Sequence, residues 1–234
     1  MRDAKPPIVD VIITARDDEL SIGSVIAGIP PRIIRSIVVV DNGSTDKTSQ
    51  LAEDAGAIVL RESRVGQGSA CLRGLTHLAT LPKPPDVVVF CPADGSFDGA
   101  ELPSLLMPLR GNLFDLAIGS RVLGSERHSP RIKLENLLTV GLIRAVYGHK
   151  YTDLSPFRAI RYPALVALGM RDTGHGWHVE MQVKALRTGL RVAEVPVRYH
   201  PQSARKRPLG EQVKGATLST TKALFRILRH STAR

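Results

Sequence analysis

An apolar run leads into a short acidic loop at Val87-Val88-Val89-Phe90-Cys91-Pro92-Ala93-Asp94-Gly95-Ser96-Phe97-Asp98. An unbroken apolar run of this kind is typical of a central parallel strand that is buried on both faces. Open α/β sheets keep their ligand sites at the carboxyl ends of such strands. The run therefore predicts a ligand site at Asp94, whose carboxylate can hold a divalent cation and, through it, a diphosphate. Pro92 stands where a paired-aspartate metal loop would have a second carboxylate.

Strand-like and helix-like segments alternate on both sides of this run. Strands are predicted at 8–14, 33–40, 57–60, 87–91, 113–118 and 191–199, and helices at 18–29, 46–55 and 67–79. This order is typical of βαβ units and predicts an α/β fold with a mostly parallel central sheet and helices on both faces. After Ser120 the alternation gives way to longer helix-like stretches.

Length and composition predict one catalytic domain at 1–200 and a basic, helical C-terminal tail at 201–234. The chain has 234 residues, 43% of them hydrophobic, which is enough for one sizeable core. Cys71 and Cys91 show no repeated spacing, so we expect reduced core residues of a cytoplasmic protein. Because no apolar run approaches about 18 to 20 residues and the N-terminus is polar, we expect neither a membrane span nor a secretory signal.

The chain is strongly basic, with 32 Lys and Arg against 22 Asp and Glu. This excess predicts attraction to anionic lipids, phosphorylated substrates or nucleic acid. A content of only 4% aromatic residues and the lack of a recognition motif argue against nucleic acid. In the tail, Lys222, Arg226 and Arg229 share one helical face and Leu224 and Leu228 another, which suits peripheral contact with the cytoplasmic face of a membrane. The alternative is a helix that packs its apolar side onto the catalytic domain.

The strand at 33–40 is followed by a turn rich in Asp, Asn and Gly, beginning at Asp41. A carboxylate at this position can accept hydrogen bonds from a nucleobase or a ribose. The alternative is an ordinary turn in which Ser44 or Thr45 caps the next helix.

A glycine pair at Gly66-Gln67-Gly68 suggests a dinucleotide-binding loop, but only weakly. Cys71 stands in place of the third glycine, and the segment does not follow the first strand. The glycines more simply allow the backbone to turn closely into the next helix, with or without a ligand beside it.

Several residues in the second half of the chain allow both a functional and a structural interpretation. His175, His178 and Glu180 suggest a metal cluster, although their spacing is not that of a zincin. Trp177 can pack in the core or stack on a sugar or lipid. Asp153 precedes a turn, where an aspartate is either functional or a cap.

Seven of these segments together resemble the family 2 glycosyltransferases and, within them, the dolichyl- or polyprenyl-phosphate sugar synthases. They are 12–19, 40–46, 66–68, 93–95, 118–121, 153–159 and 194–199, in family order across residues 8–200. The resemblance implies a GT-A fold, a nucleotide-diphosphate sugar donor and a Mg²⁺ or Mn²⁺ ion. It also implies inversion at the anomeric carbon and a polyprenyl-phosphate or other membrane-associated, phosphorylated acceptor.

The resemblance also implies roles for individual residues. Substrate binding would fall to Thr14, Ala15, Arg16, Asp18, Asp41, Gly66, Gln67, Ala93, Arg158 and Arg198. Of these, the first five would hold the nucleoside, and Arg158 and Arg198 would contact phosphates. The expected catalytic residues are Asp94, Glu180, Arg121 and Asp153, and Asp94 is also the expected metal ligand.

The chain departs from the family pattern at four positions. The family usually has proline at Thr14, asparagine at Asp17, lysine at Gln67 and an aspartate at Pro92. Proline cannot ligate a metal through its side chain, but Mg²⁺ commonly uses only one or two protein carboxylates. Two functions therefore stay open: a transferase with weakened metal binding, and a degenerate, non-catalytic relative that binds nucleotide or polyanion.

Overall fold

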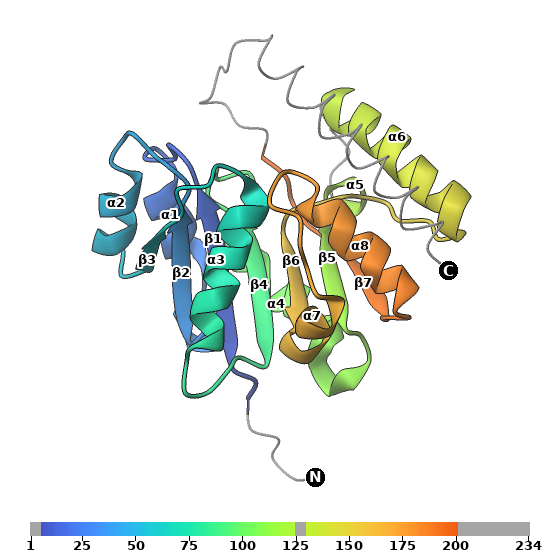
Figure 1. Ribbon diagram of the computed structural model, residues 1–234, viewed down its shortest axis with the longest axis horizontal. Coiled ribbons are helices and arrows are strands. Elements are labelled where there is room, and N and C mark those ends of the chain that lie inside the picture. Colours follow the sequence, from blue (N-terminus) through green and yellow to red (C-terminus); the bar gives the residue numbers. More distant parts are fainter. Residues whose placement is uncertain (1–5, 125–129, 201–234) are drawn as a thin grey trace.

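The computed structural model describes residues 6–124 and 130–200, with side chains from 139 onward in the second range. The predicted tail lies outside the described residues. Within them, seven strands form one sheet in the order β3-β2-β1-β4-β6-β5-β7 (Figure 1). The strands are β1 (Val9–Ala15), β2 (Ser36–Asp41), β3 (Ile58–Arg61), β4 (Val87–Pro92), β5 (Leu116–Ser120), β6 (Arg158–Arg161) and β7 (Val192–Pro196).

Parallel pairing brings the carboxyl ends of three strands to one edge of the sheet. β1 pairs in parallel with both β2 and β4, so that Thr14 lies opposite Val40 on one side and Pro92 on the other. The predicted mostly parallel α/β sheet is confirmed. The sequence did not predict β6, a four-residue strand that runs antiparallel between β4 and β5.

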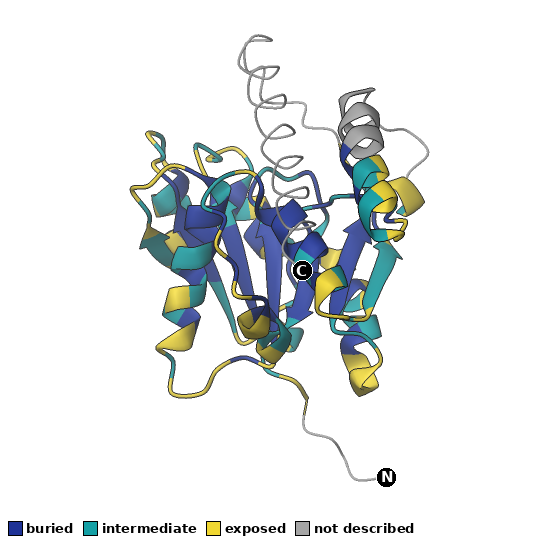
Figure 2. Ribbon diagram, turned by 45° about the vertical axis from the view of Figure 1, so that its right-hand side comes forward, coloured by how far each residue is buried: buried dark blue, intermediate teal, exposed yellow. Residues whose placement is uncertain are grey.

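Helices cover both faces of the sheet (Figure 1). The α-helices are α1 (Ile22–Gly28), α2 (Thr48–Asp54), α3 (Gln67–Ala79), α4 (Leu102–Leu106), α5 (Arg121–Gly124), α6 (Pro130–Tyr147), α7 (Tyr162–Leu168) and α8 (Trp177–Arg187). Short 3-10 helices are η1 (Pro31–Ile33), η2 (Gly99–Glu101) and η3 (Met107–Asn112). The strands at the centre are buried, and exposed residues lie mainly on the outer helices and loops (Figure 2).

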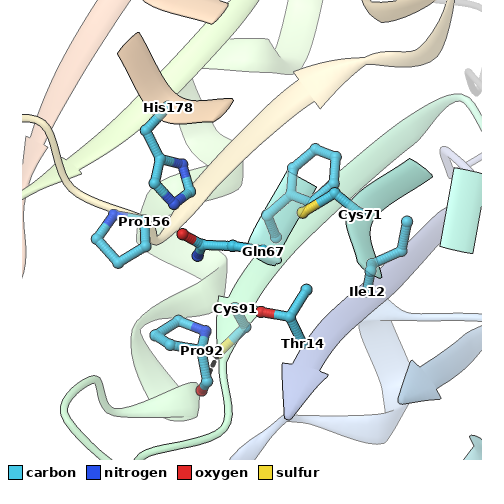
Figure 3. Close-up of a pocket in the computed structure, with 9 residues that line it drawn as sticks. Ile12, Thr14, Gln67, Cys71, Cys91, Pro92, Pro156 and His178 are labelled. Carbon is cyan, nitrogen blue, oxygen red and sulfur yellow. Dashed lines mark hydrogen bonds between the residues drawn. The ribbon is translucent and has the colours of Figure 1, made fainter. Parts of the chain in front are cut away.

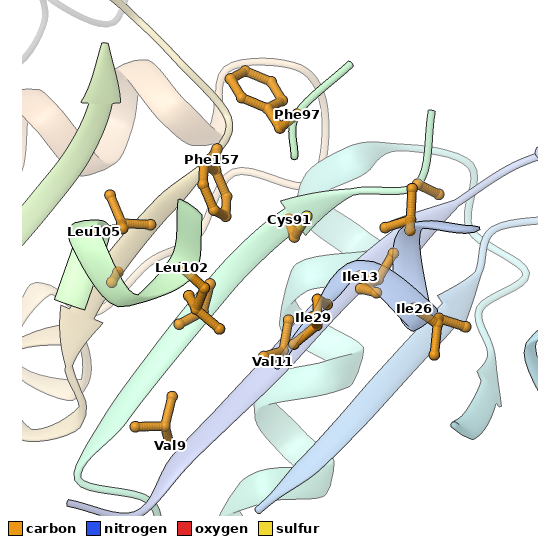
Figure 4. Packing of buried hydrophobic residues seen from close by; sticks show 14 of the residues in the cluster. Val9, Val11, Ile13, Ile26, Ile29, Cys91, Phe97, Leu102, Leu105 and Phe157 are labelled. Carbon is orange, nitrogen blue, oxygen red and sulfur yellow. The ribbon is translucent and has the colours of Figure 1, made fainter. Parts of the chain in front are cut away.

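Side chains of alternate residues in the central strands pack into two separate cores, because successive side chains of a strand point to opposite faces of the sheet. Ile12 faces the core that contains Phe90 and the residues of α3 and α8. Ile13 faces the opposite core, which contains the residues of α1 and α4 (Figure 4). Burial on both faces explains why β4 is an unbroken apolar run and why β1 is apolar except at Asp10 and Thr14.

Several predicted boundaries were displaced at turns. The strand predicted at 33–40 begins at Ser36, because Pro31 starts the 3-10 helix η1. The helix predicted at 18–29 begins at Ile22, since the backbone of Asp17 takes a left-handed φ of 49° and a turn follows it. The strands predicted at 113–118 and 191–199 are shorter and shifted, at β5 and β7.

The two cysteines are buried free thiols, as predicted. Burial raises the pKa of the Cys91 thiol to about 12 and that of Cys71 as well, so neither is a ready nucleophile. Among the helices in the described ranges, none is long and apolar enough to cross a membrane.

Candidate active site

The predicted nucleoside residues lie where β1 and β2 end side by side. Ala15 lies opposite Asp41 in the register of these strands, and Thr14 directly precedes it. Pro92 lies beside Thr14 on the other flank. Loops from three parallel strands therefore meet at this edge, which is the position predicted for the ligand site.

Hydrogen bonds join the loop after β1 to the loop after β2. Asp17 Oδ1 accepts a hydrogen bond from the Thr45 amide at 2.7 Å, and the Asp17 amide donates to Ser44 Oγ at 2.9 Å. The predicted capping of α2 by Ser44 or Thr45 is wrong, because Lys47 is the N-cap and makes no side-chain cap. Ser44 and Thr45 instead fix the β1 loop.

Asp18 shapes the loop in which it was predicted to bind a base. Its Oδ2 accepts from the Arg16 amide at 2.8 Å, and its own amide donates to Thr48 Oγ1 at 2.7 Å. These bonds hold the backbone around the predicted nucleoside residues. Base binding by Arg16 and Asp18 stays a prediction.

Asp41 is an ionised carboxylate within the turn after β2. It is nearly buried, and it accepts from the Ser44 amide at 2.8 Å and from Ser49 Oγ at 2.5 Å. Burial acts to raise the Asp41 pKa, but the hydrogen bonds from Ser44 and Ser49 outweigh it and hold the pKa below its usual value. The carboxylate therefore both closes the turn and carries negative charge at this edge.

Asn42 is a structural residue to which the sequence assigned no role. Its Nδ2 donates to the carbonyl oxygens of Glu62 and Arg64 at 3.0 and 2.8 Å, and its Oδ1 accepts from the Gly66 amide at 2.7 Å. The chain from β3 into α3 is thus fixed by one side chain. An asparagine in a glycine-containing turn was the only signal in the sequence.

The glycine pair allows α3 to begin against another part of the backbone. A Cβ atom on Gly66 would lie 2.1 Å from the Thr173 carbonyl oxygen, and one on Gly68 would lie 1.9 Å from that of Asp172. The Gly68 amide donates to the Gly174 carbonyl at 3.0 Å. The predicted close turn is confirmed, and the group it approaches is the loop before α8.

Glu180 holds that same loop from the first turn of α8. Its carboxylate accepts from the amides of Arg171 and Asp172, the latter at 2.7 Å, and pairs with Lys184 at 2.9 Å. A nearly buried carboxylate with three partners is a positioning group in this structure. A role for Glu180 toward the acceptor stays a prediction.

The acidic loop after β4 carries Asp94 with one oxygen engaged. Asp94 Oδ1 accepts from the amide and the hydroxyl of Ser96 at 2.9 and 2.5 Å, and the neighbouring Ala93 carbonyl accepts from Ser21 Oγ at 2.8 Å. Among the described residues, Oδ2 has no hydrogen-bond donor. The described side chains contain no group of three or more His, Cys, Asp and Glu able to hold a metal. A cation here would have Asp94 as its single motif carboxylate.

The predicted arginines have protein partners at separate places. Arg121 forms a bidentate salt bridge with Asp153, with Nε–Oδ2 at 2.7 Å and Nη2–Oδ1 at 2.6 Å. The Arg121 guanidinium also lies 5.5 Å from the centre of the Tyr199 ring. Arg158 is fully buried, and burial lowers its pKa to about 10. Arg198 is exposed and pairs with Glu101 at 3.1 Å.

A pocket lies beside the strand ends, between the sheet, α3 and α8 (Figure 3). It is lined by Ile12, Thr14, Gln67, Cys71, Phe90, Cys91, Pro92, Pro156 and His178. Three of the four departures from the family pattern therefore line one pocket. Trp177 does not line the pocket. Its indole is fully buried and packs edge-on against the Phe90 ring, with the ring centroids 5.9 Å apart, which confirms the prediction that Trp177 packs in the core.

The fold and the acidic strand-end loop place the protein among the GT-A nucleotide-sugar transferases. A glucosyl-3-phosphoglycerate synthase from Mycobacterium tuberculosis, solved with Mn²⁺, UDP-glucose and phosphoglyceric acid, is similar with a TM-score of 0.75 and 26% identity. The match covers 94% of this chain and 80% of that one. The chain belongs to glycosyl transferase family 2, whose model matches residues 11–169.

Relatives of known sequence support the same assignment. An uncharacterized glycosyltransferase of Mycobacterium tuberculosis is 32% identical over 212 residues, covering 90% of this chain and 94% of the relative. An undecaprenyl-phosphate mannosyltransferase of Micrococcus luteus is 32% identical over 176 residues, covering 70% of this chain and 71% of the relative. The protein is therefore a nucleotide-sugar glycosyltransferase, as the resemblance implied.

Proposed function

We propose that this glycosyltransferase moves a sugar, with inversion, from a nucleotide-diphosphate sugar to polyprenyl phosphate or a related phosphorylated acceptor at a membrane. The observation that carries the proposal is the Asp94 loop, which presents a carboxylate oxygen beside the joined loops of β1 and β2. Similarity to an undecaprenyl-phosphate mannosyltransferase over 70% of the chain supports the acceptor class.

The nucleoside would lie along the ends of β1 and β2. The loops there are fixed before a ligand arrives, because Asp17 and Asp18 bond to amides and hydroxyls across and within them. A preformed site loses little conformational entropy on binding. Asp41, already ionised, would accept hydrogen bonds from the base or ribose through its remaining lone pairs.

The diphosphate would lie at Asp94 and share a Mg²⁺ or Mn²⁺ ion with it. Mg²⁺ commonly binds through one or two carboxylates plus phosphate oxygens and waters, so a single Asp94 oxygen fits such a site. When bound, the ion would neutralise charge on the leaving diphosphate. Pro92 adds no ligand, which predicts weaker metal binding than a paired-aspartate loop would give.

The acceptor would supply its own nucleophile. A phosphate monoester with a second pKa of about 6 is largely dianionic at neutral pH and needs no general base. Its oxygen would attack the anomeric carbon as the bond from that carbon to the diphosphate breaks, which releases the nucleoside diphosphate and inverts the centre. Because no general base is needed, the reaction is compatible with the ion pairs that already engage the carboxylates of Asp153 and Glu180.

The division of labour along the chain is part of the proposal. Residues 1–200 would form the catalytic domain, and the basic segment at 201–234 would contact anionic lipid at the cytoplasmic face of a membrane. Such contact would bring the catalytic domain to a membrane-held acceptor. Arg121, Arg158 and Arg198 would add positive potential for the phosphates.

A second candidate is a non-catalytic nucleotide binder, which Pro92 specifically favours. A thermal-shift panel of nucleotide sugars detects nucleotide binding, because a ligand of the native state must raise the melting temperature of the protein. We expect UDP- or GDP-sugars to raise it more with Mg²⁺ or Mn²⁺ than without. Binding that is indifferent to both metals would favour the non-catalytic candidate.

A further inference from the structure

The segment after β7, residues 197–200, contacts the surroundings of two groups that the proposed function uses. Asp94 belongs to the loop after β4, and Arg121 begins α5 directly after β5. In the sheet, β6 lies between β4 and β5, so these two strands do not fix each other's ends by direct pairing. A residue that contacts both the loop and the start of α5 can therefore hold the carboxylate and the guanidinium in a fixed relation.

Tyr199 is joined to the Asp94 loop through Phe97. The two residues form an isolated antiparallel β-bridge, and their rings meet edge-on with the centroids 5.8 Å apart. The His200 amide donates to the Ser96 carbonyl at 3.0 Å, and the Ser96 amide donates to Asp94 Oδ1 at 2.9 Å. The backbone that carries the expected metal ligand is thus held by residues 199 and 200.

Phe97 gives this contact a fixed base. Its side chain is buried and also packs against Phe157, with the ring centroids 5.5 Å apart (Figure 4). Phe157 directly precedes β6, and its carbonyl accepts from the Gly119 amide of β5 at 2.9 Å. The rings of Phe97, Phe157 and Tyr199 thus connect the loop after β4 to the ends of β5 and β6.

Tyr199 also contacts Arg121. The guanidinium carbon lies over the Tyr199 ring, 5.5 Å from its centre, which is within the range of a cation–π interaction. Two residues earlier, the Val197 amide donates to the Ser120 carbonyl at 3.1 Å, which aligns the segment with the end of β5. The salt bridge to Asp153 holds the guanidinium, and the tyrosine ring adds a second contact from another element.

A fixed relation between these groups matters because one diphosphate would need both of them. In the proposed reaction, a cation at Asp94 and the positive charge of Arg121 would neutralise charge that develops on the leaving diphosphate. Such groups are effective only when they are positioned in advance, and a misplacement of about 1 Å can cost about a hundredfold in rate.

We propose that Tyr199 is a positioning residue for the diphosphate of the donor, because its ring holds the Asp94 loop and Arg121 together. The proposal rests on the proposed transferase function. Tyr199 acts through Phe97 and Arg121 and needs no contact of its own with the substrate. Since the ring makes both contacts, a phenylalanine should serve in its place.

The test measures binding of UDP, UMP, GDP and GMP by the full chain, with and without Mn²⁺. The metal-free ratio of diphosphate to monophosphate affinity reports the contribution of Arg121. The gain in diphosphate affinity on adding Mn²⁺ reports the Asp94 loop. We expect both quantities to fall about tenfold in Tyr199→Leu, which removes the ring, and to keep their original values in Tyr199→Phe. Metal-free monophosphate affinity should not change, because the nucleoside would lie along β1 and β2.

Tyr162→Leu is the matched control. Tyr162 is also a partly buried tyrosine, but its amide donates to the Asp86 carbonyl at 3.0 Å, at the amino end of β4 and so at the opposite end of that strand. This variant should leave both quantities unchanged even where it lowers stability. If Tyr199→Leu does not fold, Tyr199→Met, which keeps a flexible apolar side chain, carries the same expectation.

Unchanged quantities in a folded Tyr199→Leu or Tyr199→Met, or an equal fall in Tyr162→Leu, would overturn the proposal. A fall in Tyr199→Phe as large as in Tyr199→Leu would also overturn it, because the effect would then belong to the hydroxyl. If the unsubstituted chain bound no nucleotide, the proposed function would fail and this inference with it. Nucleotide binding that is the same in all variants would refute this inference alone.

Discussion

Acidic residues near the carboxyl ends of the strands are held in two different ways. One set lies in the loops after the parallel strands β1 and β2, here called the parallel side, and the other lies around β5, β6 and α8, here called the mixed side. On the parallel side, Asp17, Asp18 and Asp41 accept hydrogen bonds from backbone amides of the loops. On the mixed side, Asp153 pairs with the Arg121 guanidinium and Glu180 with Lys184, in addition to backbone amides. The carboxylates of the parallel side thus fix the shape of the loops, and those of the mixed side also form ion pairs. We expect substitutions on the mixed side mainly to cost stability, and those on the parallel side and at Asp94 mainly to cost ligand binding.

The largest expected effect is on stability, at the buried pair of Asp153 with Arg121. Asp153→Asn leaves a largely buried guanidinium without its carboxylate, so the free energy of unfolding should fall by about 3 kcal/mol. Urea denaturation measures it. Glu101→Gln, which breaks the exposed pair with Arg198, is the control and should cost less than about 1 kcal/mol. Equal losses in the two variants would contradict the contrast between the sides.

At Asp94 the effect should fall on metal use. Asp94→Asn should lower metal-dependent transfer by at least about a hundredfold and leave stability nearly unchanged. The control is Asp98→Asn in the same loop, because Asp98 only caps the Ala100 amide at 2.9 Å. Pro92→Asp should lower the Mg²⁺ concentration needed for half-maximal activity. The same metal dependence in Asp94→Asn and the parent would place the cation elsewhere.

The contact between α3 and the loop before α8 can be tested at a glycine. Gly68→Ala should destabilise the fold by about 2 kcal/mol or more, since the new methyl group would meet the Asp172 carbonyl oxygen at 1.9 Å. Gly23→Ala in α1 is the control, because a Cβ there meets no heavy atom within 4 Å. It should be neutral or stabilising. Thermal or urea unfolding of both variants decides, and equal stability would show that the close approach is absent in solution.

A smaller effect should appear in the pH dependence of stability at Asp41. Its folded pKa lies below the unfolded value of about 3.9, so its contribution is complete above that pH and is lost as the pH falls through the folded pKa. Ser49→Ala removes one of the hydrogen bonds responsible and should cost about 1 kcal/mol at pH 7. The cost should shrink as the pH falls through the folded pKa, because the carboxylate that accepts the Ser49 hydrogen bond then becomes protonated. A cost independent of pH would mean that Ser49 acts by packing alone.

The contrast between the two sides also explains what the sequence could predict. The parallel side forms from local motifs: an apolar strand, then a turn of Asp, Asn and Gly residues, so β1, β2, β4 and the place of Asp41 and Asp94 were predictable. The mixed side depends on contacts between distant residues, such as Thr152 with Glu194 and Arg121 with Asp153. No spacing rule reveals such partners, and β6 is too short to read from alternation.

His178 shows the same point at the site itself. From the sequence it was one polar residue of a doubtful metal cluster, because its spacing from His175 and Glu180 was the only available signal. The fold instead directs Glu180 to the amides of Arg171 and Asp172 and places His178 in the pocket with Thr14 and Gln67. Which neighbour on a helix faces the site is set by packing, not by spacing.

One measurement tests the central claim most directly: transfer of radiolabelled sugar from UDP-glucose and GDP-mannose to undecaprenyl phosphate by the full chain, with and without Mn²⁺. The account predicts a labelled lipid product from at least one donor. Its formation should require the metal and be lost in Asp94→Asn but not in Asp98→Asn. Nucleotide-sugar binding without any labelled lipid, at all metal concentrations, would contradict the proposed polyprenyl-phosphate acceptor.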